Sequence, residues 1–401
     1  MVSKVFFGSS QHGLPKASAS FAAKVDKVVE MLDLGTINKY DKVAIKMHLG
    51  FNEGYQTIPV FFVRRIVKAI KNAGGWPFIT DNPTAVYNAA ERGYTSETCG
   101  CPLNPITGVK DGYKVKKSIN FKNVEEIWMA GVLQDSDVLF DLSHVKGHNS
   151  CGFGGAIKNL GLGGFAAKSR WEKIHGVHQS IPYWDGRKAN PEHAKKLVKS
   201  CLYEALKYNE EKHELKLDFD SCFNTNCREC LKVDENVGSL SFRQEHFSAF
   251  SELQAIAASK VIESFDKKKR FFVNFLIEIT SYCDCWGFGQ PAIVNDIGVL
   301  ASRDPVAIET ASLDLVAREG LIDKNVPPFF RHANFKREEK LHPFQRIHGG
   351  MKNPFMAVDA LQQIFRNEYS KEYELVEVLA PKEVIEKGAP KVVKEKDPSF
   401  F

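Results

Sequence analysis

The chain has 401 residues, which is more than one average domain needs and enough for two associated lobes or one large one. Hydrophobic residues make up 43% of the sequence and charged residues 26%, a balance that excludes a mainly disordered chain. The net charge is only +5 and the basic residues are spread along the sequence, which argues against a nucleic-acid-binding protein.

The apolar segments are too short to cross a bilayer. The two longest, around residues 271–279 and 294–301, are interrupted by Asn274, Glu278 and Asp296, so we expect no membrane association. The N-terminal residues lack an apolar signal core, which predicts a cytoplasmic protein. In that compartment the nine cysteines are expected to be thiols or metal ligands rather than disulfides.

Strand-like and helix-like patterns alternate along the chain. In order, they predict a strand at 4–7, a helix at 21–34, a strand at 42–47, a helix at 60–73, strands at 77–79 and 138–142, helices at 190–208 and 246–265, strands at 271–277 and 299–302, and a helix at 305–318. This alternation predicts an α/β fold with mixed, mostly parallel sheets, helices on both faces and a small cysteine-containing insert.

Changes in composition suggest four parts, separated near the polar link 209–216. The expected parts are an N-terminal α/β lobe with a loop rich in His, Gly and Lys at 1–210, a metal-binding insert at 217–245, a C-terminal α/β lobe at 246–370 and a flexible tail at 371–401. The insert has little apolar periodicity, so we expect it to need a ligand to hold its structure.

Three cysteines are closely spaced in the insert. Cys222, Cys227 and Cys230 place three soft ligands within nine residues, near enough for thiolates to converge on zinc or an iron–sulfur cluster. Asp234 stands where a fourth cysteine would be expected, and a carboxylate can also ligate a metal. The alternative is a surface loop with three unliganded thiols.

A second cysteine pair, Cys283 and Cys285, occupies a predicted turn after the strand at 271–277. Both can ligate a metal, and they would complete the site begun by the insert if the two segments meet. The alternative is a buried apolar turn in which the cysteines are incidental.

A segment rich in His, Gly and Lys follows the strand predicted at 138–142. Gly154 and Gly155 would let backbone amides approach an anion, and Lys146 and Lys158 would add positive charge for a phosphate or carboxylate. His148 suits acid–base chemistry or metal ligation. The alternative is a tight turn without a ligand.

Two polar residues end neighbouring predicted strands. His48 and Asp81 are expected at the same sheet edge as His148, where they would line a pocket. The alternative is that Asp81 caps a turn and His48 bonds to the backbone.

Four sequence strings together resemble a known family. They are DLSHVKGH (141–148), GGAIKNLG (154–161), CDCW (283–286) and VNDIGVLASRDPVAIE (294–309), and they resemble the domain-of-unknown-function 362 family over residues 1–370. Members commonly carry a ferredoxin-type insert at the position of the Cys222 segment, so the resemblance implies an iron–sulfur protein. Because this chain has three cysteines there, the implied centre is a [4Fe–4S] cluster or an incomplete variant, with a fourth ligand from Asp234, Cys283 or Cys285.

A shorter segment is similar to the nickel-pincer lactate racemase family. His148, the pair Gly154–Gly155 and Lys158 occupy places comparable to a histidine, a Gly-Gly pair and a cofactor-tethering lysine in that family. The similarity implies that His175 or His178 would bind nickel.

These patterns support three hypotheses. The first is an iron–sulfur or metal-binding redox and electron-transfer protein that acts on a small anionic molecule or a redox protein. The second is a racemase-like enzyme for small hydroxy acids, with His148, His48 and Lys158 as catalytic residues and a cofactor held by Lys158 with Lys146, Gly154 and Gly155. The third is a zinc-stabilised structural protein.

Overall fold

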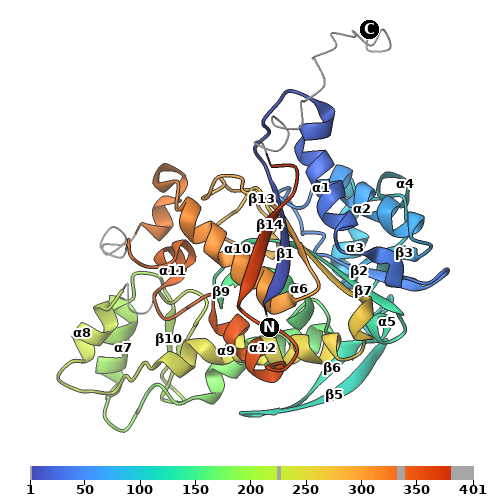
Figure 1. Ribbon diagram of the computed structural model, residues 1–401. Helices are drawn as coiled ribbons and strands as arrows, with labels where there is room; N and C mark the ends of the chain where they lie inside the picture. Colours follow the sequence, from blue (N-terminus) through green and yellow to red (C-terminus); the bar gives the residue numbers. More distant parts are fainter. Residues whose placement is uncertain (1, 224–226, 332–338, 381–401) are drawn as a thin grey trace.

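The computed structural model describes residues 2–223, 227–331 and 339–380, and an eight-stranded sheet lies at its centre (Figure 1). The strand order is β14 (Tyr373–Glu377), β1 (Ser3–Ser9), β13 (Gly298–Ser302), β12 (Arg270–Leu276), β7 (Val138–His144), β2 (Lys42–Lys46), β3 (Trp76–Asp81) and β4 (Leu103–Pro105). Neighbouring strands are parallel, except that β13 is antiparallel to β1 and β12. The predicted mixed, mostly parallel sheet is confirmed.

Helices cover both faces of this sheet. One face packs against α1 (Phe21–Glu30) and α2 (Val60–Asn72), and the other against α6 (Ala156–Gly161) and α10 (Pro305–Glu319). Helices α9 (Gln244–Ile262) and α12 (Met356–Ile364) pack behind α6 and α10. Strand β7 is buried on both faces, and it is apolar over its first three residues. Two of its three polar residues, Asp141 and Ser143, alternate with the residues that face α1 and α2. They therefore lie on the α6 side.

The cysteine-containing insert predicted at 217–245 shares a small core with the segment before it. This part of the molecule contains α7 (Pro191–Ser200), the hairpin of β10 (Leu206–Asn209) and β11 (Glu214–Leu217), and α8 (Glu229–Asp234). Figure 1 shows this part to one side of the sheet, away from α1 and α2. The helix predicted at 190–208 ends at Ser200, because Glu204 takes a left-handed conformation and the chain then pairs as β10. The expected linker 209–216 is the turn and second strand of the hairpin, whose polar residues face solvent.

The two expected α/β lobes share one sheet. Strands β12 and β13 come from the C-terminal part and lie between β1 and β7 of the N-terminal part. Part of the expected tail is also a strand, since β14 pairs with β1. The rest of that segment, residues 381–401, lies outside the described residues. Hydrogen-bonding partners far away in sequence, which composition does not reveal, account for both differences.

Smaller elements complete the fold. They are the hairpin of β5 (Lys114–Phe121) and β6 (Val124–Ala130), the hairpin of β8 (Lys146–His148) and β9 (Gly152–Gly154), and the short helices α3 (Pro83–Tyr87), α4 (Ser96–Cys99), α5 (Gly131–Gln134) and α11 (Pro343–His348). In the part of the chain that the structure describes, no helix has the length and apolar character that crossing a membrane requires.

Candidate functional site

A cavity of about 570 Å³ lies where β2, β3 and β7 end. These strands are parallel, so their carboxyl ends meet at one edge, where α/β proteins commonly bind ligands. His48 follows β2, Asp81 ends β3, and His148 belongs to the hairpin after β7. Lys146 and Lys158 line the same cavity. The structure thus brings together the three residues predicted to be catalytic.

A buried charge network forms one wall of the cavity. The ammonium group of Lys46 lies 3.0 Å from Asp81 Oδ1 and donates a hydrogen bond of 2.8 Å to Asn159 Oδ1. Burial alone would raise the pKa of Asp81, but the positive charge of Lys46 and the bond from His48 outweigh it and hold that pKa well below its usual range. Asp81 is therefore an ionised carboxylate, and sequence patterns did not identify Lys46 as its partner.

The imidazole of His48 is oriented by Asp81. Its Nδ1 lies 2.8 Å from Asp81 Oδ2, and because a carboxylate only accepts, Nδ1 carries the proton of this bond. Burial lowers the pKa of His48 more than Asp81 raises it, so the ring is neutral near pH 7. The other nitrogen, Nε2, has no partner among the described residues. His48 thus has an unprotonated nitrogen free to act as a base.

The imidazole of His148 has the opposite arrangement. Its Nδ1 accepts a hydrogen bond of 3.2 Å from the backbone N–H of Ser150, which can only donate. Burial and the nearby charge of Lys158 lower the pKa of His148 well below its usual value, so its ring is neutral. A neutral ring whose Nδ1 accepts must carry its proton on Nε2. His148 therefore has an N–H group that can donate a hydrogen bond to a negatively charged or polarised oxygen.

Lys146 forms an ion pair with Asp284, a residue that the sequence patterns did not identify. Its ammonium group lies 3.0 Å from Asp284 Oδ2, and His144 Nδ1 lies 3.0 Å from Asp284 Oδ1. Burial would raise the pKa of Asp284, but Lys146 and His144 hold it well below its usual range. Lys146 consequently supports the turn at Asp284 and is not free to bind an anion.

Two cations of the cavity are available for a ligand. Within the described residues, Lys158 has no ion-pair partner, and the buried Nε of Arg170 has no hydrogen-bond partner. Burial and the charge of Lys146 lower the pKa of Lys158 to about 8. Arg170 lies in a π-helical turn, Ser169–Ile174, a rare conformation that is frequent at functional sites. The cavity is thus suited to a small anion.

The glycine-rich run does not form the anion cradle that the sequence predicted. The carboxylate of Glu309 accepts hydrogen bonds from the backbone N–H groups of Ala156 (2.8 Å) and Ile157 (3.2 Å), so these amides at the start of α6 are already occupied. A Cβ atom on Gly155 would lie 2.3 Å from Glu309 Oε1, and one on Gly154 would lie 2.9 Å from Lys158 Cδ. Both glycines make room for protein side chains, and Gly155 also lines the main cavity.

We therefore expect Gly155→Ala to destabilise the fold by about 2 kcal/mol, as overpacking in a dense interior does. The added methyl group would displace Glu309 from the start of α6. Urea unfolding measures the loss, with Gly112→Ala as the control because no atom lies within 4 Å of the methyl group that this substitution adds. Equal stability of the two variants would contradict this account of Gly155.

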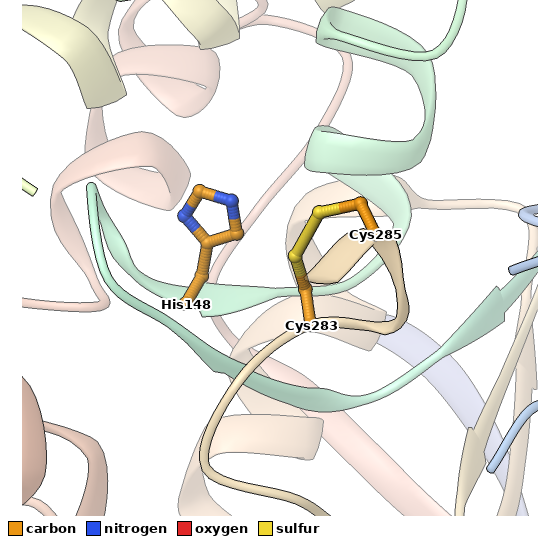
Figure 2. A group of neighbouring side chains, drawn as sticks. All are labelled: His148, Cys283 and Cys285. Carbon is orange, nitrogen blue, oxygen red and sulfur yellow. A yellow bond between two sulfur atoms is a disulfide. The ribbon is translucent and has the colours of Figure 1, made fainter. Parts of the chain in front are cut away.

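Cys283 and Cys285 are joined by a disulfide, so in this state they are not the thiolate ligands that the sequence predicted. Figure 2 shows the ring of His148 beside the two sulfur atoms, with a ring nitrogen facing them. One ligand atom from each of these three residues lies within 4.8 Å of the other two. Cys285 lines the main cavity, whereas Cys222, Cys227 and Cys230 line another. The two cysteine segments do not share a pocket.

A fourth cysteine, Cys201, joins the three cysteines of the insert. All four line one small apolar cavity of about 20 Å³. Burial and the neighbouring cysteines raise the pKa of the Cys230 thiol to about 12. Cys201 lies 21 residues before Cys222, just after α7, and that separation gave no signal in the sequence. Its proximity comes from the way α7 packs against the hairpin.

Asp234 is not placed as the fourth ligand. Its Oδ1 accepts hydrogen bonds from His193 Nε2 (2.9 Å) and Ser239 Oγ (2.6 Å), and its Oδ2 accepts one from the backbone N–H of Leu240 (2.6 Å). A buried carboxylate with three donors is fully satisfied. Asp234 therefore closes the end of the insert instead of facing the cysteines.

The two histidines that the racemase similarity implied have different positions. His175 lines the main cavity, and burial lowers its pKa to about 4. His178 is buried, and its Nδ1 donates a hydrogen bond of 2.8 Å to the carbonyl of His246. Only His175 shares the cavity with His148 and Lys158.

No protein of curated function matches this sequence. A family model does match it, over residues 43–314, and this span contains every residue discussed above as lining the main cavity. The model is described as a domain of unknown function. It covers more than half of the chain, and the chain therefore belongs to the DUF362 family.

Proposed function

We propose that the protein is an enzyme that binds a small anionic substrate in the main cavity, removes a proton from it and returns a proton to it. His48 would accept the proton at Nε2, and the N–H at Nε2 of His148 would donate a hydrogen bond to the substrate oxygen that gains negative charge. Lys158 and Arg170 would bind the negative group of the substrate. The observation that carries this proposal is the opposite protonation of the two rings, which Asp81 and Ser150 impose.

A base and a hydrogen-bond donor in one cavity are suited to removing a proton from a substrate and returning one, because the donor stabilises the negative charge that forms. Small hydroxy acids fit this site, because a carboxylate would pair with the free cations and the adjacent carbon and hydroxyl carry the protons. The proposal is thus of the racemase-like kind. Lys158 and His175 line the same cavity, and they would be the anchor and the metal ligand of a lysine-tethered cofactor, which would supply hydride acceptance. Arg170 would then bind the carboxylate without Lys158.

Deuterium exchange from D₂O into a panel of small hydroxy acids tests this proposal by NMR. We expect His48→Gln and His148→Gln to reduce the exchange rate by about a hundredfold or more, as loss of a general base or of a hydrogen bond to the developing charge does. His12→Gln is the control, since His12 is exposed. Exchange that is equal in all three variants, or absent with every acid of the panel, would contradict the proposal. A mass increase on Lys158 would reveal a tethered cofactor.

A second candidate function is electron transfer through a metal centre held by Cys201, Cys222, Cys227 and Cys230. Among the described residues, the group within single-ion distance is the one around His148, not these four. Sulfur atoms around one zinc ion lie about 3.8 Å apart. An iron–sulfur cluster spreads its thiolates farther, and a cluster is the centre that we propose for this pocket. Asp220 lines the main cavity two residues before Cys222, which would bring a cluster close to the substrate.

Anaerobic purification followed by iron and sulfide analysis tests this candidate. We expect both elements in the wild-type protein and their loss in Cys201→Ser. Cys99→Ser should keep them, because Cys99 is buried in the core against α2 and far from the insert in the fold. Zinc without iron would instead support the structural role, and wild-type levels of iron and sulfide in Cys201→Ser would exclude Cys201 as a ligand.

A further inference from the structure

The disulfide between Cys283 and Cys285 exposes one of its sulfur atoms to the main cavity. Cys283 is 1% exposed, whereas Cys285 is exposed and lines the cavity beside Trp286. A molecule in the cavity can therefore reach Cys285 but not Cys283. Dithiol pairs that exchange with substrates commonly have this asymmetry, because one sulfur is attacked and the other leaves.

This disulfide adds little to the stability of the fold. It closes a loop with a single residue between its cysteines, and the stabilisation that a disulfide provides through chain entropy decreases with loop length. The intervening residue, Asp284, is already held by His144 and Lys146. The turn is thus fixed by ion pairs whether the disulfide is open or closed, and a structural role leaves the disulfide unexplained.

The neighbouring groups suit a thiolate. A ring nitrogen of His148 faces the sulfurs (Figure 2), and since Nδ1 accepts from Ser150, the proton of the neutral ring is on Nε2. A nitrogen that carries a proton is not free to ligate a metal, so His148 is expected to donate a hydrogen bond to a sulfur atom. The positive charge of Lys158 in the same cavity stabilises a thiolate.

We propose that Cys283 and Cys285 form a redox-active pair that exchanges with a small thiol bearing a negative charge. The substrate thiolate attacks Cys285 Sγ, the bond to Cys283 Sγ breaks, and Cys283 leaves as a thiolate that accepts a hydrogen bond from His148. A second substrate thiolate then attacks the substrate sulfur of the mixed disulfide and releases Cys285 as a thiolate. In total, two substrate thiolates are oxidised to one disulfide, and the protein disulfide is reduced to two thiolates, which take up the two protons that the substrate thiols released to water. The preference for a charged thiol rests on the anion site of the proposed function, but the exchange does not.

One tryptic peptide reports the state of the pair. Residues 271–303 follow Arg270, end at Arg303 and contain no other cysteine, lysine or arginine. The native protein is equilibrated in buffers with an increasing ratio of reduced to oxidised glutathione. It is then alkylated and digested, and the mass of this peptide is measured by mass spectrometry. We expect a single two-electron transition within the glutathione range. A disulfide that persists in reduced glutathione would overturn the proposal, as would thiols that become alkylated only after zinc is chelated.

Two variants test the asymmetry and the charge preference. Cys283→Ser leaves the exposed thiol and should form a mixed disulfide with the anionic probe 5,5′-dithiobis(2-nitrobenzoate). Cys285→Ser leaves the buried thiol and should not react in the same time. Adding Lys158→Met to Cys283→Ser should slow this reaction about tenfold, because local charge raises association rates. The rate of reaction with the neutral probe 2,2′-dithiodipyridine should be the same with and without Lys158→Met.

Equal reactivity of the two single variants would overturn the assignment of Cys285 as the attacked sulfur. Equal rates with and without Lys158 would remove the charge preference while leaving the exchange. Deuterium exchange into hydroxy acids, measured on the Cys283→Ser variant, separates the two proposals. Intact proton exchange with lost thiol exchange, or the reverse, shows which of them has failed.

Discussion

Replacing Lys158 by methionine is expected to stabilise the protein while removing its anion site. Burial lowers the pKa of Lys158 to about 8 from an ordinary 10.5. That interval corresponds to about 3 kcal/mol of destabilisation when the amine is protonated in the fold. Because the Lys158 side chain is half-buried at the wall of the cavity, solvent screening reduces this cost, and we expect a gain of about 2 kcal/mol.

The gain should depend on pH. The folded pKa lies below the unfolded one, so the cost of the charge is fully present below pH 8 and disappears as the pH rises towards 10.5. Urea unfolding at several pH values measures the difference between the variant and the wild type. Lys46→Met is the matched control, and it should destabilise the fold because it leaves Asp81 as an unpaired buried charge. A loss of stability in Lys158→Met would contradict this account.

Asp81→Asn is expected to be among the most destabilising changes to the cavity. It leaves the ammonium group of Lys46 buried without a counter-charge, which costs about 3–5 kcal/mol. The folded pKa of Asp81 is held below its unfolded value, so the contribution of Asp81 is full above about pH 4 and is lost as the pH falls. The difference between variant and wild type should therefore shrink in acid.

Thermal and urea unfolding between pH 7 and pH 3 measure this effect. Asp26→Asn provides the control, because Asp26 forms an exposed ion pair with Arg65 and such pairs contribute less than about 1 kcal/mol. Asp81→Asn should also remove the preference of His48 for the tautomer with its proton on Nδ1, and the ¹⁵N NMR shifts of the ring would reveal this change. Equal stability of Asp81→Asn and Asp26→Asn at pH 7 would disprove the buried charge network.

The position of the cavity could be predicted from the sequence because it depends on strand ends. His48, Asp81 and His148 follow strands whose apolar runs are easy to recognise, and parallel strands end at the same edge. The hydrogen-bond partners of these residues could not be predicted. Which nitrogen of His48 or His148 carries the proton depends on Asp81 and on the backbone of Ser150, and strand patterns say nothing about either.

Residues that act over long sequence separations were also missed. Glu309 lies more than 150 residues after the helix start that it caps, and Cys201 reaches the insert only through tertiary packing. Asp234 has the spacing of a ligand, but the turn that follows it offers two donors, Ser239 and Leu240, and His193 of α7 offers a third. These contacts depend on chain segments that sequence spacing does not relate.

The placement of β1 in the sheet affects the synthesis of the chain. The strand leaves the ribosome before both of its neighbours, since it lies between β13 and β14, which are made about 300 and 370 residues later. At about 5–20 residues per second, β1 waits on the order of 15–70 seconds for its partners. During that time its unpaired edges are open to other chains. Release of a nascent chain before residue 373 would leave one of those edges permanently without a neighbour.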